Sequence, residues 1–366
     1  MSDSRDNPDQ RLEQVRGRID DLDRRILELI NERAGCAQEV AEIKRAGGEN
    51  NNFSRPEREA QLLRELAAAT RGPLDAAAVT RVFREIISAC LALEQPLAVA
   101  YLGPAGTFTQ SAVYRHFGRS IEARPLAAID EVFREVAAGT AQFGVVPVEN
   151  STEGMVTHTV DMFVNSNLRI CGEVLLRVHH HLVSGADSAE GVKTLYSHQQ
   201  SFAQCREWLD ANLPNAERIA VSSNAEAARR AADEPGTAAI APAMAAEIYG
   251  LNTLVERIED EPDNTTRFLV VGDYDVPPTG DDKTSLLLSA RNRPGALYHL
   301  IQPLAEHGID MTRLESRPTR GRLWEYMFFV DILGHAEDEA VKPALEALKE
   351  EAALCRVLGS YPRALS

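Results

Sequence analysis

The stretch RLEQVRGRIDDLDRRILELINERAGCAQEVAEIKR, residues 11–45, decides how the first part of this chain folds. From Leu12 to Ile43, apolar residues recur every three or four positions with no intervening proline, which is the period of an α-helix. Such a helix is about 50 Å long, at about 1.5 Å per residue. It cannot bury its apolar face within a small monomer, so the pattern predicts an intertwined dimer.

Two shorter helices are expected after this one. The glycines at 47–48 end the long helix. Ser54 and Glu57 have the spacing of a capping box, which predicts the start of a second helix. Asp75 is a typical N-cap for a third helix. Residues 1–95 are therefore expected to form an all-α domain.

Composition and charge narrow the class of protein. Of the 366 residues, 44% are hydrophobic, which is ordinary for a globular protein, and the net charge of −16 argues against a nucleic-acid partner. No apolar run reaches about 18 residues, so no membrane-spanning segment is expected. The polar, acidic first ten residues do not resemble a secretion signal. Five scattered cysteines without a CxxC pair predict neither disulfides nor a metal site, and favour the cytoplasm.

From residue 97, short apolar runs alternate with helical stretches. The runs are Leu97–Leu102, Gly144–Val148, Leu175–Val183, Ala238–Ala241 and Phe268–Val271. This alternation predicts an α/β domain with a largely parallel sheet over residues 96–276, followed by a short linker at 277–282. Residues 281–366 then show the order strand, helix, strand, strand, helix, strand, with a hairpin turn near Gly321. That order is typical of an α+β ferredoxin-like plait.

The first domain places several cations beside its apolar face. Arg33 and Lys44 are eleven residues apart, so they lie within about 20° of each other around the helix. Arg16 lies about 100° around the helix from Arg33 and can reach the site of a partner chain. A pocket with several cations favours a small dianion. Without a nucleophile or a metal set, its chemistry would be a rearrangement helped by orientation and fixed charge.

Residues 11–94 resemble the all-helical class of chorismate mutases. The matching positions are Arg16-x-x-Ile19-x-x-Leu22-Asp23, Glu32-Arg33, Val40-x-x-x-Lys44, Pro56-Glu57-Arg58-Glu59 and Phe83-x-x-Ile86-Ile87. The resemblance implies that Arg33 and Arg58, together with Arg16 of a partner chain, bind the carboxylates of chorismate.

Three further side chains have implied roles in that site. By resemblance, Lys44 contacts the ether oxygen of chorismate and Glu59 receives the substrate hydroxyl. Glu94 stands where some members of the family have glutamine, facing the ether oxygen. A carboxylate there would repel the charge that develops on this oxygen, so Glu94 is expected to act in its protonated form.

Four polar stretches lie at the ends of predicted strands in the α/β domain. They are Gly103–Thr109, Pro147–Gly154, Ser197–Cys205 and Asn264–Phe268. Open α/β sheets bind their ligands at strand ends. Together the stretches resemble the prephenate dehydratase family, whose fold has two lobes like a periplasmic binding protein. The triplet Thr266-Arg267-Phe268 is the family's most specific mark.

This second resemblance implies a dehydration coupled to decarboxylation, which yields phenylpyruvate. Thr266 would donate a hydrogen bond to the leaving hydroxyl. The implied substrate-binding residues are Gly106, Thr107, Asn150, Ser151, Gln204 and Arg267. Among them, Arg267 and the turn at 106–107 would hold carboxylates. The run at 179–181, three histidines, falls in an apolar stretch read as a strand, and we interpret it as structural.

Two motifs in the last segment resemble the effector site of an ACT domain. They are Arg293-Pro294-Gly295-Ala296-Leu297 and Glu315-Ser316-Arg317-Pro318. In that family the two motifs form an amino-acid site at a dimer interface. The residues implied here are Gly295, Ala296, Leu297, Glu315, Ser316, Arg317 and Pro318. Phenylalanine is then expected to inhibit the dehydratase by binding one arrangement of the protein better than another.

The three resemblances follow the order of a bifunctional family that makes phenylpyruvate from chorismate. Chorismate and prephenate would be the substrates and phenylalanine the effector, with no cofactor or metal, in a cytoplasmic homodimer or homotetramer. A fused prephenate dehydrogenase is disfavoured, because the sequence lacks GxGxxG. An arogenate dehydratase and a non-catalytic amino-acid sensor stay open. The sensor would have no need of Thr266 or of the cations at Arg33 and Lys44.

Overall fold

The computed structural model describes residues 8–47, 55–291, 293–318 and 326–364. Three helices form the helical module: α1 (Pro8–Ala46), α2 (Pro56–Ala69) and α3 (Ala76–Glu94). Asp75 caps α3 as expected, because its side chain accepts a hydrogen bond from the N–H of Ala78 at 2.7 Å. The predicted capping residue Ser54 lies outside the described residues. α2 has Pro56 at its start, after Arg55.

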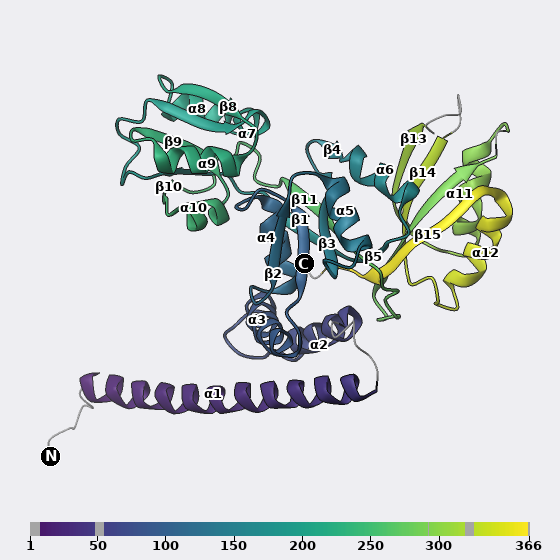
Figure 1. Ribbon diagram of the computed structural model, residues 1–366, viewed down its shortest axis with the longest axis horizontal. Coiled ribbons are helices and arrows are strands. Elements are labelled where there is room, and N and C mark those ends of the chain that lie inside the picture. The colour runs from purple at the N-terminus through teal and green to yellow at the C-terminus, as the bar shows by residue number, and fades with distance from the viewer. Residues whose placement is uncertain (1–7, 48–54, 292, 319–325, 365–366) are drawn as a thin grey trace, which may run out of the picture.

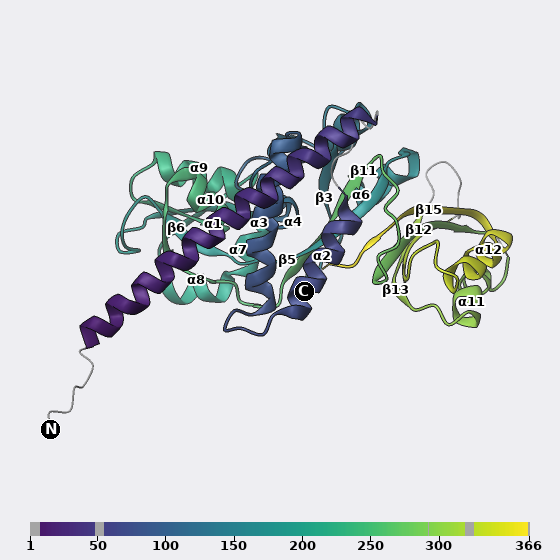
Figure 2. The ribbon, with the colours of Figure 1, turned by 90° about the horizontal axis from the view of Figure 1, so that it is seen from below.

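The long helix α1 leaves most of its apolar face uncovered. Figure 1 shows α1 beneath α2 and α3, and Figure 2 shows its N-terminal end projecting past the rest of the chain. Leu12, Leu22 and Ile43 are 49%, 51% and 71% exposed. Ala41 is the one fully buried residue along the described length of this helix. The predicted continuous helix is confirmed, and a single chain does not cover its apolar face.

The middle of the chain forms two lobes, each a sheet with helices packed on it. The first lobe contains β1 (Ala98–Leu102), α4 (Phe108–Phe117), β2 (Glu122–Leu126), α5 (Ile129–Ala137), β3 (Phe143–Asn150), β4 (Gly154–Met155), α6 (Thr157–Asn165), β5 (Arg169–Arg177) and β11 (Thr265–Gly272). Its strand order is β2-β1-β3-β11-β5, and β4 pairs with β3. Helices lie on both faces of the sheet (Figure 1), so strands such as β1 are apolar throughout.

The second lobe is inserted between β5 and β11. It contains β6 (His181–Ser184), β7 (Thr194–His198), α7 (Gln199–Gln204), α8 (Arg206–Asn212), β8 (Glu217–Val221), α9 (Asn224–Asp233), β9 (Thr237–Ala241), α10 (Ala243–Tyr249) and β10 (Asn252–Val255). Its strand order is β10-β6-β9-β7-β8. The expected two-lobed α/β architecture is therefore present.

Two expectations about these sheets are wrong. Both sheets are mixed rather than largely parallel: β1 is parallel to β2 and β3, whereas β11 is antiparallel to β3 and β5. The apolar run Leu175–Val183 is not one strand, because β5 ends at Arg177 and β6 begins at His181 in the other lobe. Apolar runs contain no information on strand direction or on crossings between lobes, since both depend on distant packing.

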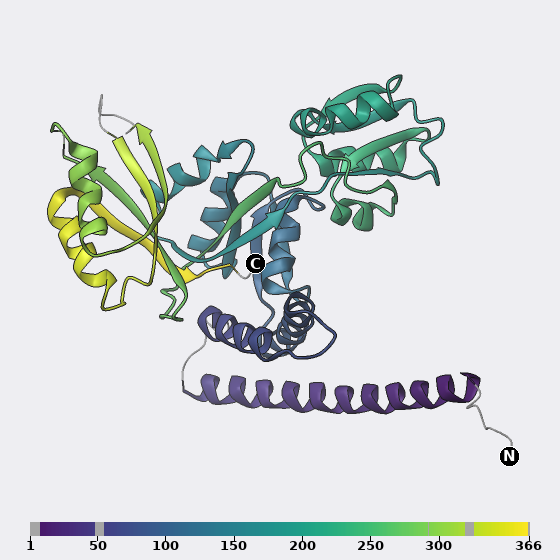
Figure 3. The same ribbon diagram turned by 180° about the vertical axis from the view of Figure 1, so that it is seen from behind.

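The last module, here termed the plait, has the sheet order β13-β14-β12-β15. Its elements are β12 (Asp282–Ala290), α11 (Ala296–Glu306), β13 (Met311–Pro318), β14 (Tyr326–Leu333), α12 (Val341–Glu351) and β15 (Ala352–Pro362). Figure 3 shows the plait and the second lobe at opposite ends of the first lobe. The expected turn near Gly321 and the strand start at Trp324 lie outside the described residues.

The plait and the first lobe share one hydrophobic core. α11 and α12 cover one face of the plait sheet, and the opposite face packs on the first lobe (Figure 1). Leu287, Phe329 and Tyr361 of the plait are at most 2% exposed and belong to the same buried cluster as Phe163 of α6. Apolar burial therefore fixes the plait against the first lobe, beyond the tether that the linker provides.

Candidate active sites

A cavity of about 630 Å³, here termed the helical cavity, opens between α1, α2 and α3. Its lining includes Arg33, Lys44, Arg58, Glu59 and Glu94. Arg33 and Lys44 reach it from one face of α1, as their spacing of eleven residues predicts. A small dianion in this cavity would meet cations from two helices at once, in surroundings partly shielded from water.

Two of the three carboxyl groups that line the helical cavity, those of Glu59 and Glu94, hold their protons more tightly than usual. Burial raises the pKa of Glu59 to about 7, although Arg84 and Arg33 oppose this shift. Burial also raises the pKa of Glu94, against the opposing effect of cations of which Lys44 is the largest contributor. A raised pKa favours the protonated form of Glu94, and only that form can donate a hydrogen bond.

Arg16 lies on α1 outside the helical cavity. Its side chain is exposed, and it precedes Arg33 by seventeen residues. At about 1.5 Å per residue, the two positions are about 25 Å apart along the helix. Arg16 therefore does not reach the helical cavity of its own chain, and a role in such a cavity needs a second chain.

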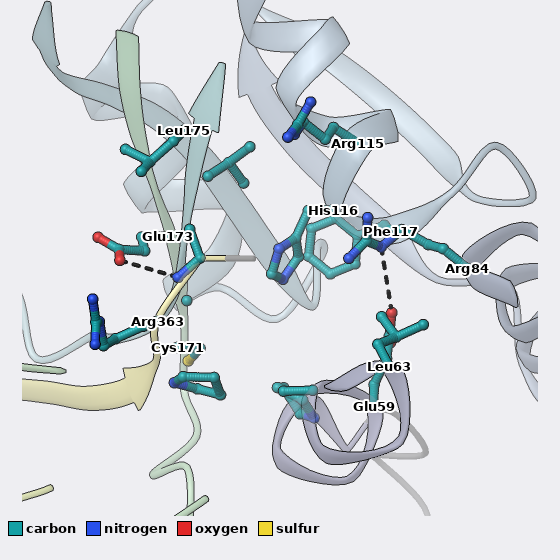
Figure 4. Close-up of a pocket in the computed structure, with 16 residues that line it drawn as sticks. Glu59, Leu63, Arg84, Arg115, His116, Phe117, Cys171, Glu173, Leu175 and Arg363 are labelled. Atoms are coloured by element: carbon teal, nitrogen blue, oxygen red, sulfur yellow. Dashed lines mark hydrogen bonds and ion pairs between the residues drawn. The ribbon is translucent and has the colours of Figure 1, made fainter. Parts of the chain in front are cut away.

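A second cavity of about 70 Å³, here termed the junction cavity, lies between the helical module, the first lobe and the end of β15 (Figure 4). Glu59 lines both cavities, and its carboxylate lies 3.8 Å from Nε of Arg84. Burial, followed by the charge of Arg84, lowers the pKa of His116 in α4 to about 3, so its ring is neutral. Glu59 therefore connects the helical cavity with the first lobe, which no sequence pattern indicates.

A group of polar side chains at the start of β11, here termed the strand-end cluster, is built around Thr266. The Oγ1 of Thr266 accepts a hydrogen bond from Nδ2 of Asn150 at 2.8 Å. The Oδ1 of Asn150 accepts from the N–H groups of Thr152 and Glu153 at 3.0 and 3.1 Å, which fixes the orientation of the amide. Because Asn150 donates to Oγ1, the hydroxyl hydrogen of Thr266 is left to donate to a ligand.

Asn264 belongs to the strand-end cluster, although the sequence analysis assigned it no role. It is 5% exposed, and its Oδ1 accepts a hydrogen bond from Nδ2 of Asn150 at 2.8 Å. Ser151 accepts a hydrogen bond from the N–H of Thr265 at 2.9 Å and lies 3.4 Å from Asn264. The sequence spacing could have indicated this role. Asn264 and Thr266 are two residues apart, so in an extended strand their side chains point to the same face of the sheet.

The turn at Gly106 differs from the expected anion site. The N–H of Gly106 donates to Oε1 of Gln110 at 2.6 Å, and Thr107 caps α4. Gly106 has φ +87°, and a Cβ there would lie 3.2 Å from the Cα of Ala245 in the second lobe. The turn therefore allows the two lobes to approach closely. The N–H of Gly106 is engaged by Gln110 in this structure, and a role of the turn in carboxylate binding stays a prediction.

Gln204 is held by a histidine that the sequence analysis interpreted as structural. His180 lies in the crossing between β5 and β6, not in a strand, and is 1% exposed. Its Nε2 lies 2.8 Å from Oε1 of Gln204, and its ring packs edge-on against Phe108, next to Thr107. Burial lowers the pKa of His180, so the neutral ring donates through Nε2. His180 therefore connects predicted site residues of the two lobes.

Arg267 does not point into the strand-end cluster. Its side chain is 6% exposed, and it donates to Glu173 at 2.8 Å, to Asp331 at 2.5 Å and to the hydroxyl of Tyr361 at 2.9 Å. Neighbouring residues of a strand point to opposite faces, so Arg267 points away from the side of Thr266. The prediction that Arg267 binds a substrate carboxylate is wrong, because residues of β5 and the plait occupy its guanidinium.

The two effector motifs lie on different elements of the plait. Gly295 precedes α11 with φ +73°, a conformation that glycine adopts most readily, and 296–297 begin the helix. Arg317 of β13 donates to both carboxylate oxygens of Asp161 in α6, at 2.9 and 3.0 Å. The second motif is therefore tied to the first lobe, and the other residues of that motif lie on the same strand.

Three family models match the chain in succession. Chorismate mutase type II matches residues 15–95, prephenate dehydratase matches 99–275 and the ACT domain matches 284–350. The prephenate dehydratase of Arthrobacter aurescens, solved in complex with L-Phe, is 37% identical with a TM-score of 0.67. That match covers 73% of this chain and 90% of the other.

Full-length relatives have the same arrangement. The bifunctional chorismate mutase/prephenate dehydratase of Stutzerimonas stutzeri is 57% identical over 97% of this chain and 98% of the relative. The enzyme of the same name from Pseudomonas aeruginosa is 56% identical over the same shares. Both matches extend across the helical module, the two lobes and the plait. The chain therefore belongs to the family of bifunctional chorismate mutase/prephenate dehydratases, with a C-terminal ACT domain.

Proposed function

We propose that the helical cavity carries the chorismate mutase activity of this family and that the strand-end cluster carries its prephenate dehydratase activity. The convergence of Arg33, Lys44 and Arg58 in one cavity is the main support. Arg33 and Arg58 bind the carboxylates of chorismate and hold it in a reactive shape. Lys44 stabilises the charge that develops on the ether oxygen as its bond breaks.

Glu94→Gln is expected to change the pH dependence of the mutase reaction. The proposed role needs a protonated carboxyl group, and burial raises the pKa of Glu94. The wild-type rate should therefore fall as the pH rises through that pKa, whereas glutamine does not titrate. Glu59 titrates in both proteins, so the difference between the two profiles of kcat against pH reports Glu94. Coinciding profiles would remove the role assigned to Glu94.

In the strand-end cluster, Thr266 assists the departure of the ring hydroxyl of prephenate. A threonine hydroxyl is a very weak acid, so its help is a positioned hydrogen bond and not a full proton transfer. As the hydroxyl leaves with its electron pair, the C–C bond to the ring carboxylate breaks and its electrons enter the ring. The departing hydroxide takes up a proton from solvent, so the products are water, carbon dioxide and phenylpyruvate. Gln204, held by His180, orients the substrate from the second lobe.

A second copy of the chain covers α1 in the proposed assembly, a homodimer or a homotetramer. The uncovered apolar residues of α1, such as Leu22 and Ile26, which are both 51% exposed, support this proposal. The position of Arg16 supports it as well. Arg16 lies too far along α1 from the helical cavity of its own chain, so it can contribute only to the cavity of another chain. The partner chain buries the apolar face and supplies Arg16 to the site.

Phenylalanine is the proposed effector of the plait. The relative from Arthrobacter aurescens was solved with L-Phe, and it shares the lobes and the plait. The proposed binding residues are the two motifs at 295–297 and 315–318. Phenylalanine bound there favours an arrangement of the plait in which the dehydratase is less active.

Gly295→Ala is expected to weaken inhibition by phenylalanine. Its φ of +73° strains any residue that has a Cβ, so the loop before α11 should leave its binding conformation. A Cβ at this position would meet His299 only at 3.5 Å, so no clash enters the core. The measurement is the phenylalanine concentration that halves the dehydratase rate, which should rise. Equal inhibition of variant and wild type would contradict the site.

Domain boundaries and the cellular compartment are also part of the proposal. Domains at 1–95, 96–276 and 281–366 are supported by the three family-model ranges. All five cysteines are free thiols, which supports a reducing compartment such as the cytoplasm. In the described part of the chain, no helix is both long and apolar enough to cross a membrane.

One experiment tests the proposed function as a whole. Purified protein is given chorismate and, in separate assays, prephenate or arogenate, without any added cofactor, and the aromatic product is followed. Appearance of phenylpyruvate from chorismate and from prephenate supports the proposal. Turnover of arogenate in preference to prephenate would make the protein an arogenate dehydratase instead. A protein that binds phenylalanine but converts none of these substrates would be the sensor.

A further inference from the structure

A closed ring of hydrogen bonds surrounds Arg267 where the first lobe meets the plait. Nη1 of Arg267 donates to Oδ2 of Asp331 at 2.5 Å, and Nη2 donates to Oη of Tyr361 at 2.9 Å. The Oγ of Ser285 donates to Oδ1 of Asp331 at 2.5 Å and lies 2.7 Å from Oη of Tyr361. Because Ser285 gives its hydrogen to Asp331, Tyr361 is the donor to Ser285, and every hydroxyl hydrogen in the ring has an acceptor.

The remaining side of Arg267 is bound to strand β5 of its own lobe. Nε of Arg267 donates to Oε2 of Glu173 at 2.8 Å. Lys283 of the plait also binds Glu173, with Nζ 3.0 Å from both carboxylate oxygens, and the N–H of Ala364 donates to Oε1 at 3.1 Å. Figure 4 shows Glu173 beside the end of β15. Two cations face two carboxylates, so the network buries no net charge.

The two carboxylates and the tyrosine of the network are buried. Glu173 is 4% exposed, and Asp331 and Tyr361 are 0% exposed. Burial by itself lowers the pKa of Arg267, but Tyr361, Asp331 and Glu173 outweigh it and raise the pKa above its ordinary value. The guanidinium therefore stays charged. A buried network with all its partners in place holds its members in one geometry, so the boundary at Arg267 is rigid.

This rigid point is one residue from the proposed hydroxyl donor. Thr266 pairs with Asn150 across the ladder between β11 and β3. Immediately after Arg267 the pairing shifts by one residue, which marks a β-bulge between Arg267 and Phe268. A bulge re-aims nearby side chains and interrupts the ladder with β3, while the ladder with β5 stays in register at Thr266 and Arg267. Arg267 adds side-chain hydrogen bonds on the opposite face of β11, next to this irregularity.

We propose that Arg267 is a positioning residue of the dehydratase reaction. By anchoring β11 to Asp331 and Tyr361 of the plait, it holds the hydroxyl of Thr266 in line with Asn150. The inference rests on the proposed function of Thr266 as the hydroxyl donor. It follows that the plait sheet has two roles. It carries the effector motifs, and through Asp331 and Tyr361 it also holds the strand of the dehydratase site in place.

Tyr361→Phe and Asp331→Asn test this inference with little change of shape. Arg267→Met would leave two buried carboxylates short of a cation and could unfold the protein. In each test variant, kcat of the dehydratase is expected to fall about tenfold and KM to stay within about twofold, because a misaligned Thr266 loses a transition-state contact. The mutase rate of the same protein should match wild type. Wild-type dehydratase kcat in both variants would overturn the inference.

Arg169→Met is the matched control. Arg169 lies on β5, and its Nη1 donates to the backbone oxygen of Val357 in β15 at 2.8 Å. It therefore crosses the same boundary without touching Arg267. Its dehydratase kcat is expected to stay at the wild-type value. A tenfold loss here as well would mean that any damage to the boundary lowers the rate, which overturns a specific role for Arg267.

A double-mutant cycle separates this inference from the proposed function. If Arg267 acts through Thr266, Tyr361→Phe should lower kcat less than about twofold once Thr266→Ala is present. An equal tenfold loss in both backgrounds overturns the positioning role and leaves the role of Thr266 intact. If Thr266→Ala alone leaves kcat unchanged, the proposed function fails, and the inference fails with it.

Discussion

Thr266→Ala is expected to lower kcat of the dehydratase by about 10²–10³-fold, with a much smaller change in the KM for prephenate. Asn150 donates to Oγ1 of Thr266 at 2.8 Å, so in the proposed reaction the hydroxyl hydrogen can be donated to the leaving group. Alanine removes that hydrogen bond, which strengthens as the hydroxyl departs. Steady-state kinetics with prephenate measure kcat and KM separately.

Two companion variants make this result specific. Thr266→Ser keeps the hydroxyl and should retain most of the activity, because Asn150 can still donate to it. Thr265→Ala changes the neighbouring residue, whose Oγ1 contacts the backbone oxygen of Asp263 at 3.3 Å, and should have little effect on kcat. A Thr266→Ala protein with raised KM and near-normal kcat would show that Thr266 only binds substrate.

Lys44→Met is expected to lower kcat of the mutase by at least about 100-fold and to leave the dehydratase rate unchanged. Methionine fills a similar space but cannot offset the negative charge on the breaking ether bond. Arg25→Met, at an exposed arginine of the same helix outside the helical cavity, is the control and should be fully active. Both rates are measured on the same purified protein.

Subunit mixing extends this prediction to the assembly. Arg16→Met should also lose mutase activity, because the proposed dimer combines Arg16 of one chain with Lys44 of the other. After subunit exchange at equal amounts, the two inactive proteins should recover about a quarter of the wild-type rate, since half of the dimers are mixed and each has one intact site. An active Arg16→Met protein, or no recovery after exchange, would contradict the shared site.

The parts of the molecule that the sequence predicted well are those with short-range geometry. The pitch of one helix places Arg33 and Lys44 on the same face, whatever surrounds them. A capping residue such as Asp75 acts within one turn of its own helix. The family motifs located Thr266 and Asn150, and their pairing across two strands agrees with a common site.

The sequence did not show which partners two polar groups have. The N–H of Gly106 donates to Gln110, four residues away, and the second lobe lies directly against this turn. His180 was expected in a strand, because an apolar run does not show where the chain crosses between lobes. The partner of His180, Gln204, lies in the second lobe, so this contact depends on how the chain crosses between the lobes.

Three modules, the continuous helix α1 and five charged residues of the helical cavity could be predicted without the structure. The five residues are Arg33, Lys44, Arg58, Glu59 and Glu94. Periodicity and motif spacing are local properties of the chain, so they can be recognised without knowledge of the fold. The position of Arg267 at the boundary between the first lobe and the plait, in contrast, depends on long-range packing. Its partner Asp331 is 64 residues away, and the two meet because the plait and the first lobe bury a common apolar core.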